Sequence, residues 1–290
     1  MSQTILFHCG SAKTGSTTIQ NELWAARSSL REAGYYVCSR FVRAGDVDPL
    51  NIAIRDIRFR DLEKGVALGR ERVEELFKMN GVHTVILSNE SAFGDPFYDG
   101  HEGFFSLFHR SMAGIARVFE GFTVVPLFVI RDQARLLPSF YTQRVRQGSV
   151  YTDRVFYDRV MAFDLSWVPV IEQLRAVFPN TVVRAYEGLG RDSPLAASLL
   201  AGHLPDSCLR SIGPVASKNN SASLRALRLM RLLNLAQQRT KSPLVKRVRP
   251  TLLRWIERRV WGRKAALPAA YAEKLAALYE ADRRCLFGEG

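Results

Sequence analysis

Short apolar runs alternate along the chain with longer stretches in which apolar residues recur at helical spacing. Runs rich in apolar and β-branched residues predict buried strands at residues 4–8, 84–88, 123–130 and 181–185. Helical spacing runs from Thr17 to a stop at Ala33-Gly34, and it recurs over residues 61–79, 103–119, 134–147 and 166–178. From Ser221 onward the pattern is almost entirely helical.

This alternation predicts the fold class. Strands separated by helices up to about residue 190 are typical of an α/β protein with a central, mainly parallel sheet and helices on both faces. Since 290 residues are an ordinary length for one domain, we expect a single domain with an α/β core over 1–190 and a mostly helical extension over 191–290. Ligands bind such sheets at the carboxyl ends of the strands, so the residues that follow the strands are the first candidates for a site.

The first strand is followed by a loop of small and hydroxyl side chains, Gly10-Ser11-Ala12-Lys13-Thr14-Gly15-Ser16-Thr17-Thr18. Glycines let successive backbone N–H groups point at one anion, and the helix that follows adds the partial positive charge of its N-terminus. Lys13 adds a full charge. The loop is therefore a candidate phosphate-binding site, with an ordinary strand-to-helix turn as the alternative.

The loop resembles the Walker A motif of nucleoside-triphosphate enzymes but departs from it. Gly10 and Gly15 have the Walker separation, whereas Ser16 occupies the position where Walker loops carry lysine. The lysine of this chain, Lys13, lies inside the loop instead. The strand at 84–88 also ends without the aspartate of a Walker B motif. A nucleoside-triphosphate loop is therefore the second alternative.

The segment His8-Cys9-Gly10-Ser11-Ala12-Lys13-Thr14-Gly15-Ser16-Thr17-Thr18-Ile19-Gln20 is similar to the 5′-phosphosulfate loop of sulfotransferases, in particular of their bacterial carbohydrate-type branch. The resemblance implies a P-loop-like three-layer sandwich that uses 3′-phosphoadenosine 5′-phosphosulfate (PAPS), releases 3′-phosphoadenosine 5′-phosphate (PAP) and requires no metal. It implies cofactor contacts from Lys13, Thr14, Gly15, Ser16, Thr17 and Thr18. The resemblance is specific at this loop and weak after about residue 190.

The same resemblance implies a site for the 3′-phosphate at the end of a later strand. Family members close that strand with Arg and carry Ser about eight residues on, and Arg131 and Ser139 have this spacing. An arginine offers phosphate two parallel hydrogen bonds, and a serine adds a hydroxyl. Gln133 stands where the family often has Pro. Without the loop, a salt bridge from Arg131 to Asp132 or Glu120 would be the simpler interpretation.

Sulfuryl transfer to an alcohol needs a base beside the acceptor hydroxyl. Glu90 lies in the segment Ser88-Asn89-Glu90-Ser91-Ala92-Phe93, and several carbohydrate sulfotransferases carry a Glu in a similar context that is proposed as that base. The alternative is a structural Glu that caps the next turn or pairs with a surface arginine. Rival bases are His8, His101 and His109, and Cys9 is a weaker candidate for a nucleophile.

A further cationic contact with the donor is expected from Lys218. The stretch Lys218-Asn219-Asn220-Ser221 follows Gly213-Pro214 and would form a lid that reaches back to the donor phosphates. A loop before a helix, with Ser221 as the N-cap of that helix, is an equally good interpretation.

The formal net charge of +13 and the pI of about 10.0 indicate an acidic partner. Residues 244–264 combine eight basic residues with Leu, Ile, Val and Trp. We expect a surface helix that packs Leu253, Ile256 and Val260 on the core. The alternative is peripheral contact with an anionic membrane, an acidic glycan or a glycolipid. No nucleic-acid partner is expected, because the chain lacks helix-turn-helix, zinc and aromatic RNA-binding patterns.

No segment is typical of export or of membrane insertion. The chain has no stretch of roughly 18 apolar residues, and its N-terminus lacks the basic and apolar regions of a signal peptide. The four cysteines follow no metal-ligand spacing. We therefore expect a cytoplasmic protein with reduced, mostly buried thiols, and peripheral contact at the inner face of the membrane as an addition.

The resemblance and these residues together predict direct in-line sulfuryl transfer from PAPS. The acceptor would be a hydroxyl or amine of a carbohydrate, a glycolipid, a lipid-linked sugar or a small metabolite. Lys13 would neutralise the charge that grows on the leaving phosphate oxygen, and Glu90 would accept the acceptor's proton. The alternatives are a small-molecule P-loop kinase that uses Mg-ATP and a non-catalytic PAP-binding module that docks on membranes.

Overall fold

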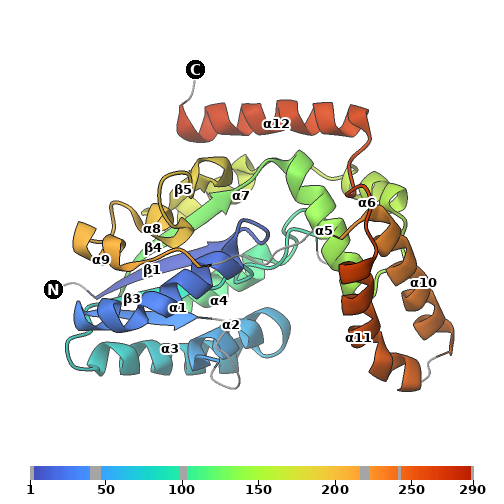
Figure 1. Ribbon diagram of the computed structural model, residues 1–290. Helices are drawn as coiled ribbons and strands as arrows, with labels where there is room; N and C mark the ends of the chain where they lie inside the picture. Colours follow the sequence, from blue (N-terminus) through green and yellow to red (C-terminus); the bar gives the residue numbers. More distant parts are fainter. Residues whose placement is uncertain (1–2, 40–46, 98–102, 216–221, 241–242, 289–290) are drawn as a thin grey trace. The chain divides into compact units, whose positions relative to one another are not determined.

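The computed structural model describes residues 3–39, 47–97, 103–215, 222–240 and 243–288. The chain divides into two compact units (Figure 1). The first, which we call the sheet unit, comprises Met1–Arg131 and Ser166–Ser217, and the second, the helical unit, comprises Asp132–Leu165 and Lys218–Gly290. The helical unit is thus built from two separate stretches of chain. The single-domain organisation expected from the sequence stays a prediction.

Five parallel strands form the centre of the sheet unit: β1 (Thr4–Gly10), β2 (Tyr35–Ser39), β3 (Thr84–Ser88), β4 (Thr123–Ile130) and β5 (Val182–Ala185). Their order across the sheet is β2-β3-β1-β4-β5, so the first strand of the chain lies in the middle. The pairing of β1 with β4 is interrupted by a bulge between His8 and Gly10. The carboxyl end of β1 is therefore flanked by those of β3 and β4.

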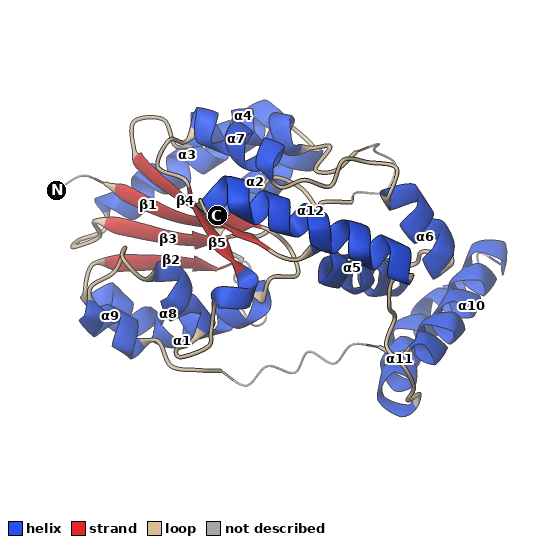
Figure 2. Ribbon diagram, turned by 90° about the horizontal axis from the view of Figure 1, so that it is seen from above, coloured by secondary structure: helices blue, strands red, loops and turns tan. Residues whose placement is uncertain are grey.

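Helices cover both faces of this sheet (Figure 2). On one face lie α1 (Ser16–Glu32), α8 (Leu195–Leu200) and α9 (Asp206–Ser211). On the other lie α3 (Leu62–Lys78), α4 (Phe108–Val118) and α7 (Val168–Val177), and α2 (Pro49–Phe59) packs against α3 and α4. The α/β class and the three-layer arrangement predicted from the alternating pattern are confirmed.

Each central strand has a buried side chain on either face, because successive residues of a strand point in opposite directions. Leu6 of β1 belongs to the apolar cluster under α1, together with Ile19, Leu23 and Leu30 of that helix. Phe7 points the other way and meets the rings of Phe93 and Phe119 edge to face, with centroids 5.7 and 5.5 Å away. Burial on both faces explains why these strands are unbroken apolar runs in the sequence.

Most predicted elements form, and the exceptions have physical reasons. β3 and β4 have the predicted bounds, and β1 and β5 differ from theirs by at most two residues. The helix predicted from residue 103 begins only at Phe108, because Gly103 and Phe105 have left-handed backbones, with φ 117° and 55°. The edge strand β2 and the short helix α2 were not predicted. The Asp48-Pro49 pair that begins α2 is nevertheless a recognisable helix start.

The helical unit contains α5 (Gln133–Gln147), α6 (Asp153–Val160), α10 (Leu224–Thr240), α11 (Pro243–Arg259) and α12 (Ala269–Phe287). This agrees with the helical pattern predicted after Ser221. Asp132 begins α5 by accepting a hydrogen bond from the backbone N–H of Ala134. None of the helices in the described part of the chain is long and apolar enough to cross a membrane.

A buried amide connects α10 to the end of α5. The Nδ2 of Asn234 donates to the carbonyls of Val145 and Ser149, both at 2.8 Å, and its Oδ1 accepts from Nε of Arg249 at 3.0 Å. A second buried amide connects α12 to the start of α5, because the Nε2 of Gln133 donates to the Asp282 carboxylate at 2.9 Å. Because these partners come from distant parts of the sequence, the amides determine how the helices pack.

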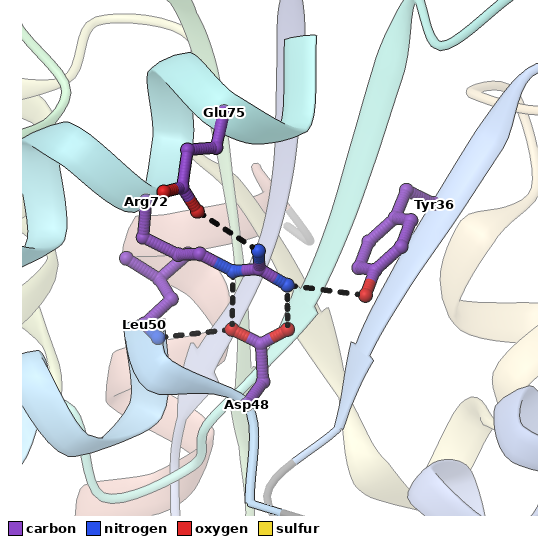
Figure 3. Close-up of polar contacts among 5 residues, drawn as sticks. All are labelled: Tyr36, Asp48, Leu50, Arg72 and Glu75. Atoms are coloured by element: carbon purple, nitrogen blue, oxygen red, sulfur yellow. Dashed lines mark hydrogen bonds and ion pairs between the residues drawn. The ribbon is translucent and has the colours of Figure 1, made fainter. Parts of the chain in front are cut away.

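An ion-pair cluster at the edge of the sheet unit joins β2, α2 and α3 (Figure 3). Asp48 accepts a hydrogen bond from the backbone N–H of Leu50 at the start of α2. Its two oxygens also face the Arg72 guanidinium, at 3.5 and 3.2 Å, and Arg72 reaches Tyr36 and Glu75 as well. Asp48 is therefore both a helix cap and the partner of a half-buried arginine.

Asp48→Ala should cost about 2–3 kcal/mol of unfolding free energy, because it removes the cap and the ion pair together. Asp61→Ala is the matched control, since Asp61 caps α3 through the Lys64 N–H but is exposed. It should cost only about 1 kcal/mol. Urea unfolding of both variants measures the difference, and equal losses would contradict a stabilising Asp48–Arg72 pair.

Candidate functional site

The loop after β1 begins where the connections of the sheet change direction. The chain passes from β1 to β2 and β3 on one side, and from β4 to β5 on the other. In open α/β sheets, ligands bind at such a point, beyond the carboxyl ends of the strands. The candidate residues Lys13, Glu90 and Arg131 follow β1, β3 and β4, which are adjacent strands. The topology therefore gathers them at one edge of the sheet.

Two glycines shape the loop for different reasons. A Cβ at Gly10 would lie 2.3 Å from the Phe128 ring, so no side chain fits there. Gly15 has a left-handed backbone with φ 80°, and a Cβ there would lie 2.8 Å from Leu195 and 3.3 Å from Tyr186. The two glycines predicted from the motif are thus required by packing and by backbone conformation.

Two hydrogen bonds hold the curvature of the loop, one to β4 and one within the loop itself. The N–H of Ser11 donates to the carbonyl of Val129 at 2.9 Å, and the hydroxyl of Thr14 donates to the carbonyl of Ser11 at 2.5 Å. Both Ser11 and Thr14 are fully buried. The Thr14 hydroxyl therefore stabilises the loop itself, and the predicted contact of Thr14 with a cofactor stays a prediction.

The loop ends at the N-terminus of α1, which no side chain caps. Gly15 is the N-cap and has no side chain to cap the helix, and the first turn contains no acidic residue. The first N–H groups of a helix have no partner within it, and they favour negative charge. Ser16 is buried, Thr17 is exposed and Thr18 is partly exposed. Together with Lys13, which has a φ of 71°, this is a site suited to a phosphate-sized anion.

Arg131 is directed toward this loop from the end of β4. One guanidinium nitrogen donates to the Lys13 carbonyl, and the guanidinium lies 4.7 Å from the centre of the Tyr186 ring. The Arg131 carbonyl accepts from the indole N–H of Trp167 at 3.1 Å. Its Nε is buried and has no hydrogen-bond partner in the described part of the chain. The side chain is thus oriented by the loop and by Tyr186.

Glu90 is connected to the same helix from the other side. The Nε2 of Gln20, in the second turn of α1, donates to the Glu90 carboxylate at 2.8 Å and to the Ser88 carbonyl at 3.3 Å. Gln20 is buried, whereas Glu90 is partly exposed. Residues four apart lie on one face of a helix, so Gln20 lies beneath Ser16 of the loop. The carboxylate is therefore fixed relative to the predicted anion site.

His8 and Cys9 lie beneath the loop and are fully buried. The Nδ1 of His8 is 2.9 Å from the Ser88 hydroxyl, and burial lowers the pKa of His8 to about 4. His8 is therefore neutral at pH 7 and joins β1 to β3. Burial raises the pKa of the Cys9 thiol well above its ordinary value, which leaves no thiolate to act as a nucleophile. His109 lies exposed on α4.

Three further predicted residues are Ser139, Lys218 and His101. Ser139 is a partly exposed residue of α5, in the helical unit, and its role beside Arg131 stays a prediction. Lys218 and His101 lie outside the described residues.

Gln20 and Tyr186 were not assigned roles from the sequence. Gln20 ends the motif segment and falls one helical turn after Ser16, which is a readable signal. Tyr186 directly follows β5, at the carboxyl end of a strand. Its contact with Arg131 is set by the neighbouring position of β4 and β5, and this pairing cannot be read from the sequence.

Neither protein-family models nor curated proteins match this chain. Its function is therefore inferred from the residues and the geometry of the sheet unit.

The buried His8 should make stability depend on pH. Between pH 6.5 and 4 the unfolded chain takes up a proton at this residue while the folded chain does not, so the unfolding free energy falls as pH falls. From pH 7 to pH 5 the His8 contribution should be a loss of about 2 kcal/mol. Denaturant unfolding at both pH values should show that His8→Gln lacks this loss and that His109→Gln, at an exposed position, retains it. An equal pH response in His8→Gln and the unmodified protein would refute the assignment.

Proposed function

We propose that this chain is a sulfotransferase with a P-loop-like fold that uses PAPS as its donor. The observation that carries the proposal is that residues following two strands next to β1 are connected to the loop after β1 and to the helix that begins there. Arg131, from the strand on one side, donates to the Lys13 carbonyl, and Glu90, from the strand on the other side, is held by Gln20 of α1. A cation and a carboxylate thus flank one anion site.

The chemistry of the donor set fits PAPS. PAPS carries a phosphosulfate and a separate 3′-phosphate, so its binding calls for two cationic sites. The N-terminus of α1 and Lys13 suit the first, since no side chain caps that helix. Arg131 suits the second, because its buried Nε has no partner among the described residues.

PAPS, when bound, supplies a sulfuryl group joined to a phosphate leaving group. In the proposed reaction the sulfur would form a bond to the acceptor oxygen while its bond to the phosphate oxygen breaks, so that PAP would leave. Lys13 offsets the negative charge on the departing oxygen, and the Glu90 carboxylate takes the proton of the acceptor hydroxyl. Gln20 positions that carboxylate. The acceptor class we propose is a hydroxylated glycan, a glycolipid or a small hydroxylated metabolite.

PAP should raise the melting temperature of the protein by several degrees, since a ligand at 100 times its Kd adds about 2.7 kcal/mol of stability. Lys13→Ala and Arg131→Ala should each abolish the PAP-induced shift, because each removes a phosphate contact. Differential scanning fluorimetry with and without PAP measures the shift within each variant.

Lys78→Ala and Arg175→Ala, at exposed positions of the sheet unit, are the matched controls and should retain the full PAP shift. Mg-ATP is the second ligand to test. A shift with Mg-ATP alone would replace the sulfotransferase by a P-loop kinase, and no shift with either nucleotide would refute the donor site.

Glu90→Gln should lower turnover by roughly 10²-fold while leaving the PAP-induced shift intact, because the amide cannot accept the proton. Turnover is measured as transfer of labelled sulfate from PAPS to the best acceptor in a panel of glycans and alcohols. Glu32→Gln, at an exposed carboxylate of the same sheet unit, is the control. Normal turnover in Glu90→Gln would show that another group is the base. A PAP shift without sulfate transfer by the unmodified protein to any acceptor would leave a binding module.

A further inference from the structure

The positive charge of the chain is concentrated in one segment. Residues 218–264 contain 14 of the 41 Lys and Arg residues and only one of the 28 Asp and Glu residues. The formal charge of this segment, +13, therefore equals the net charge of the whole chain, and the other residues balance to zero. Such a concentration is a feature of a binding surface rather than of general solubility.

The described part of this segment is largely an α10–α11 helical pair within the helical unit (Figures 1 and 2). On α10, Leu229 and Leu232 are exposed, Leu232 at 62%. They are three residues apart and so share one face of the helix. Arg225 and Arg228 are exposed on the same face by their spacing. The face therefore combines leucines and arginines that are both open to solvent.

The second helix and its C-terminal end repeat this combination. Val248 and Trp255 of α11 are exposed and lie seven residues apart, which places them on one face. Trp261, just after α11, is 80% exposed. Arg247 and Arg259 are exposed as well. Large exposed apolar residues interspersed with cations are typical of helices that lie at a membrane interface.

The opposite face of α11 packs against the rest of the helical unit. Leu253 and Ile256 are buried, as predicted, whereas Val260 is only partly buried. Arg249 bonds Asn234, and Glu257, the one acidic residue of the segment, pairs with Arg146 of α5. The buried face of α11 therefore supplies the contacts that hold the helical unit together, and the exposed tryptophans and arginines are not among them.

We propose that the exposed faces of α10 and α11, together with Trp261, dock on an anionic lipid surface. Leu229, Leu232, Trp255 and Trp261 would enter the boundary between headgroups and acyl chains, while the arginines pair with lipid phosphates. The positive charge of this surface would also attract a nucleic acid. A nucleic acid, however, would leave the exposed leucines and tryptophans without an apolar partner. The surface extends the membrane contact expected for 244–264 to α10, and it is independent of the proposed reaction.

Vesicle co-sedimentation tests the proposal with the full chain. Binding to phosphatidylcholine vesicles should be weak, and adding phosphatidylglycerol as about a third of the lipid should strengthen it by at least tenfold. Trp255→Ala with Trp261→Ala, and separately Arg228→Glu with Arg259→Glu, should each weaken binding to the anionic vesicles at least tenfold. Circular dichroism verifies that both variants retain their helices.

The matched controls lie in the sheet unit, where Leu68→Ala with Val177→Ala and Arg175→Glu with Arg210→Glu change exposed residues of the same kinds. Both controls should bind as the unmodified protein does. Equal binding to neutral and anionic vesicles would overturn the proposal. So would full binding to anionic vesicles by either the double tryptophan variant or the double arginine variant. So would tight binding to duplex DNA that loses its strength with Arg228→Glu and Arg259→Glu but not with the tryptophan changes.

Discussion

The approach of the Phe128 ring to the backbone of Gly10 is the constraint on which the rest of the site depends. A side chain at residue 10 would overlap the ring, so β1 can end against β4 only because this residue is glycine. Trp167 packs edge to face on Phe128 and also donates to the carbonyl of Arg131. The same contact therefore positions the start of the loop and the residue at the end of the neighbouring strand. From there Arg131 reaches the carbonyl of Lys13 and completes the connection.

Beneath this loop the buried polar groups are neutral. Burial keeps His8 uncharged, Ser88 carries a hydroxyl group and Gln20 carries an amide group. Neutral groups cost less to bury than charged ones, and their hydrogen bonds can still fix the direction of a carboxylate at the rim. The charged groups of the site, Lys13, Arg131 and Glu90, are all partly exposed. The arrangement orients charges without burying them.

The distribution of charge separates two kinds of recognition. Outside residues 218–264 the formal charges balance, so the proposed attraction of the loop for an anion would be local and would come from a helix terminus, Lys13 and Arg131. The excess charge belongs to helices whose inner faces are already packed. The proposed long-range attraction to an anionic surface and the proposed short-range binding of a nucleotide would therefore belong to different parts of the sequence.

The sequence by itself determined the α/β class, four of the five strands and the loop with its two glycines. These features are local, because hydrophobic periodicity and the conformational needs of a strand-to-helix turn act over a few residues. It also identified Lys13, Glu90 and Arg131 as candidates, since each lies in the segment that follows a predicted strand. Only the tertiary structure decided that β1 lies between β3 and β4, that Gln20 holds Glu90 and that Tyr186 lies against Arg131. The physical reason is that strand order depends on how helices pack over both faces of the sheet, and this packing joins residues as far apart as Glu22 of α1 and Ala196 of α8, 174 positions away.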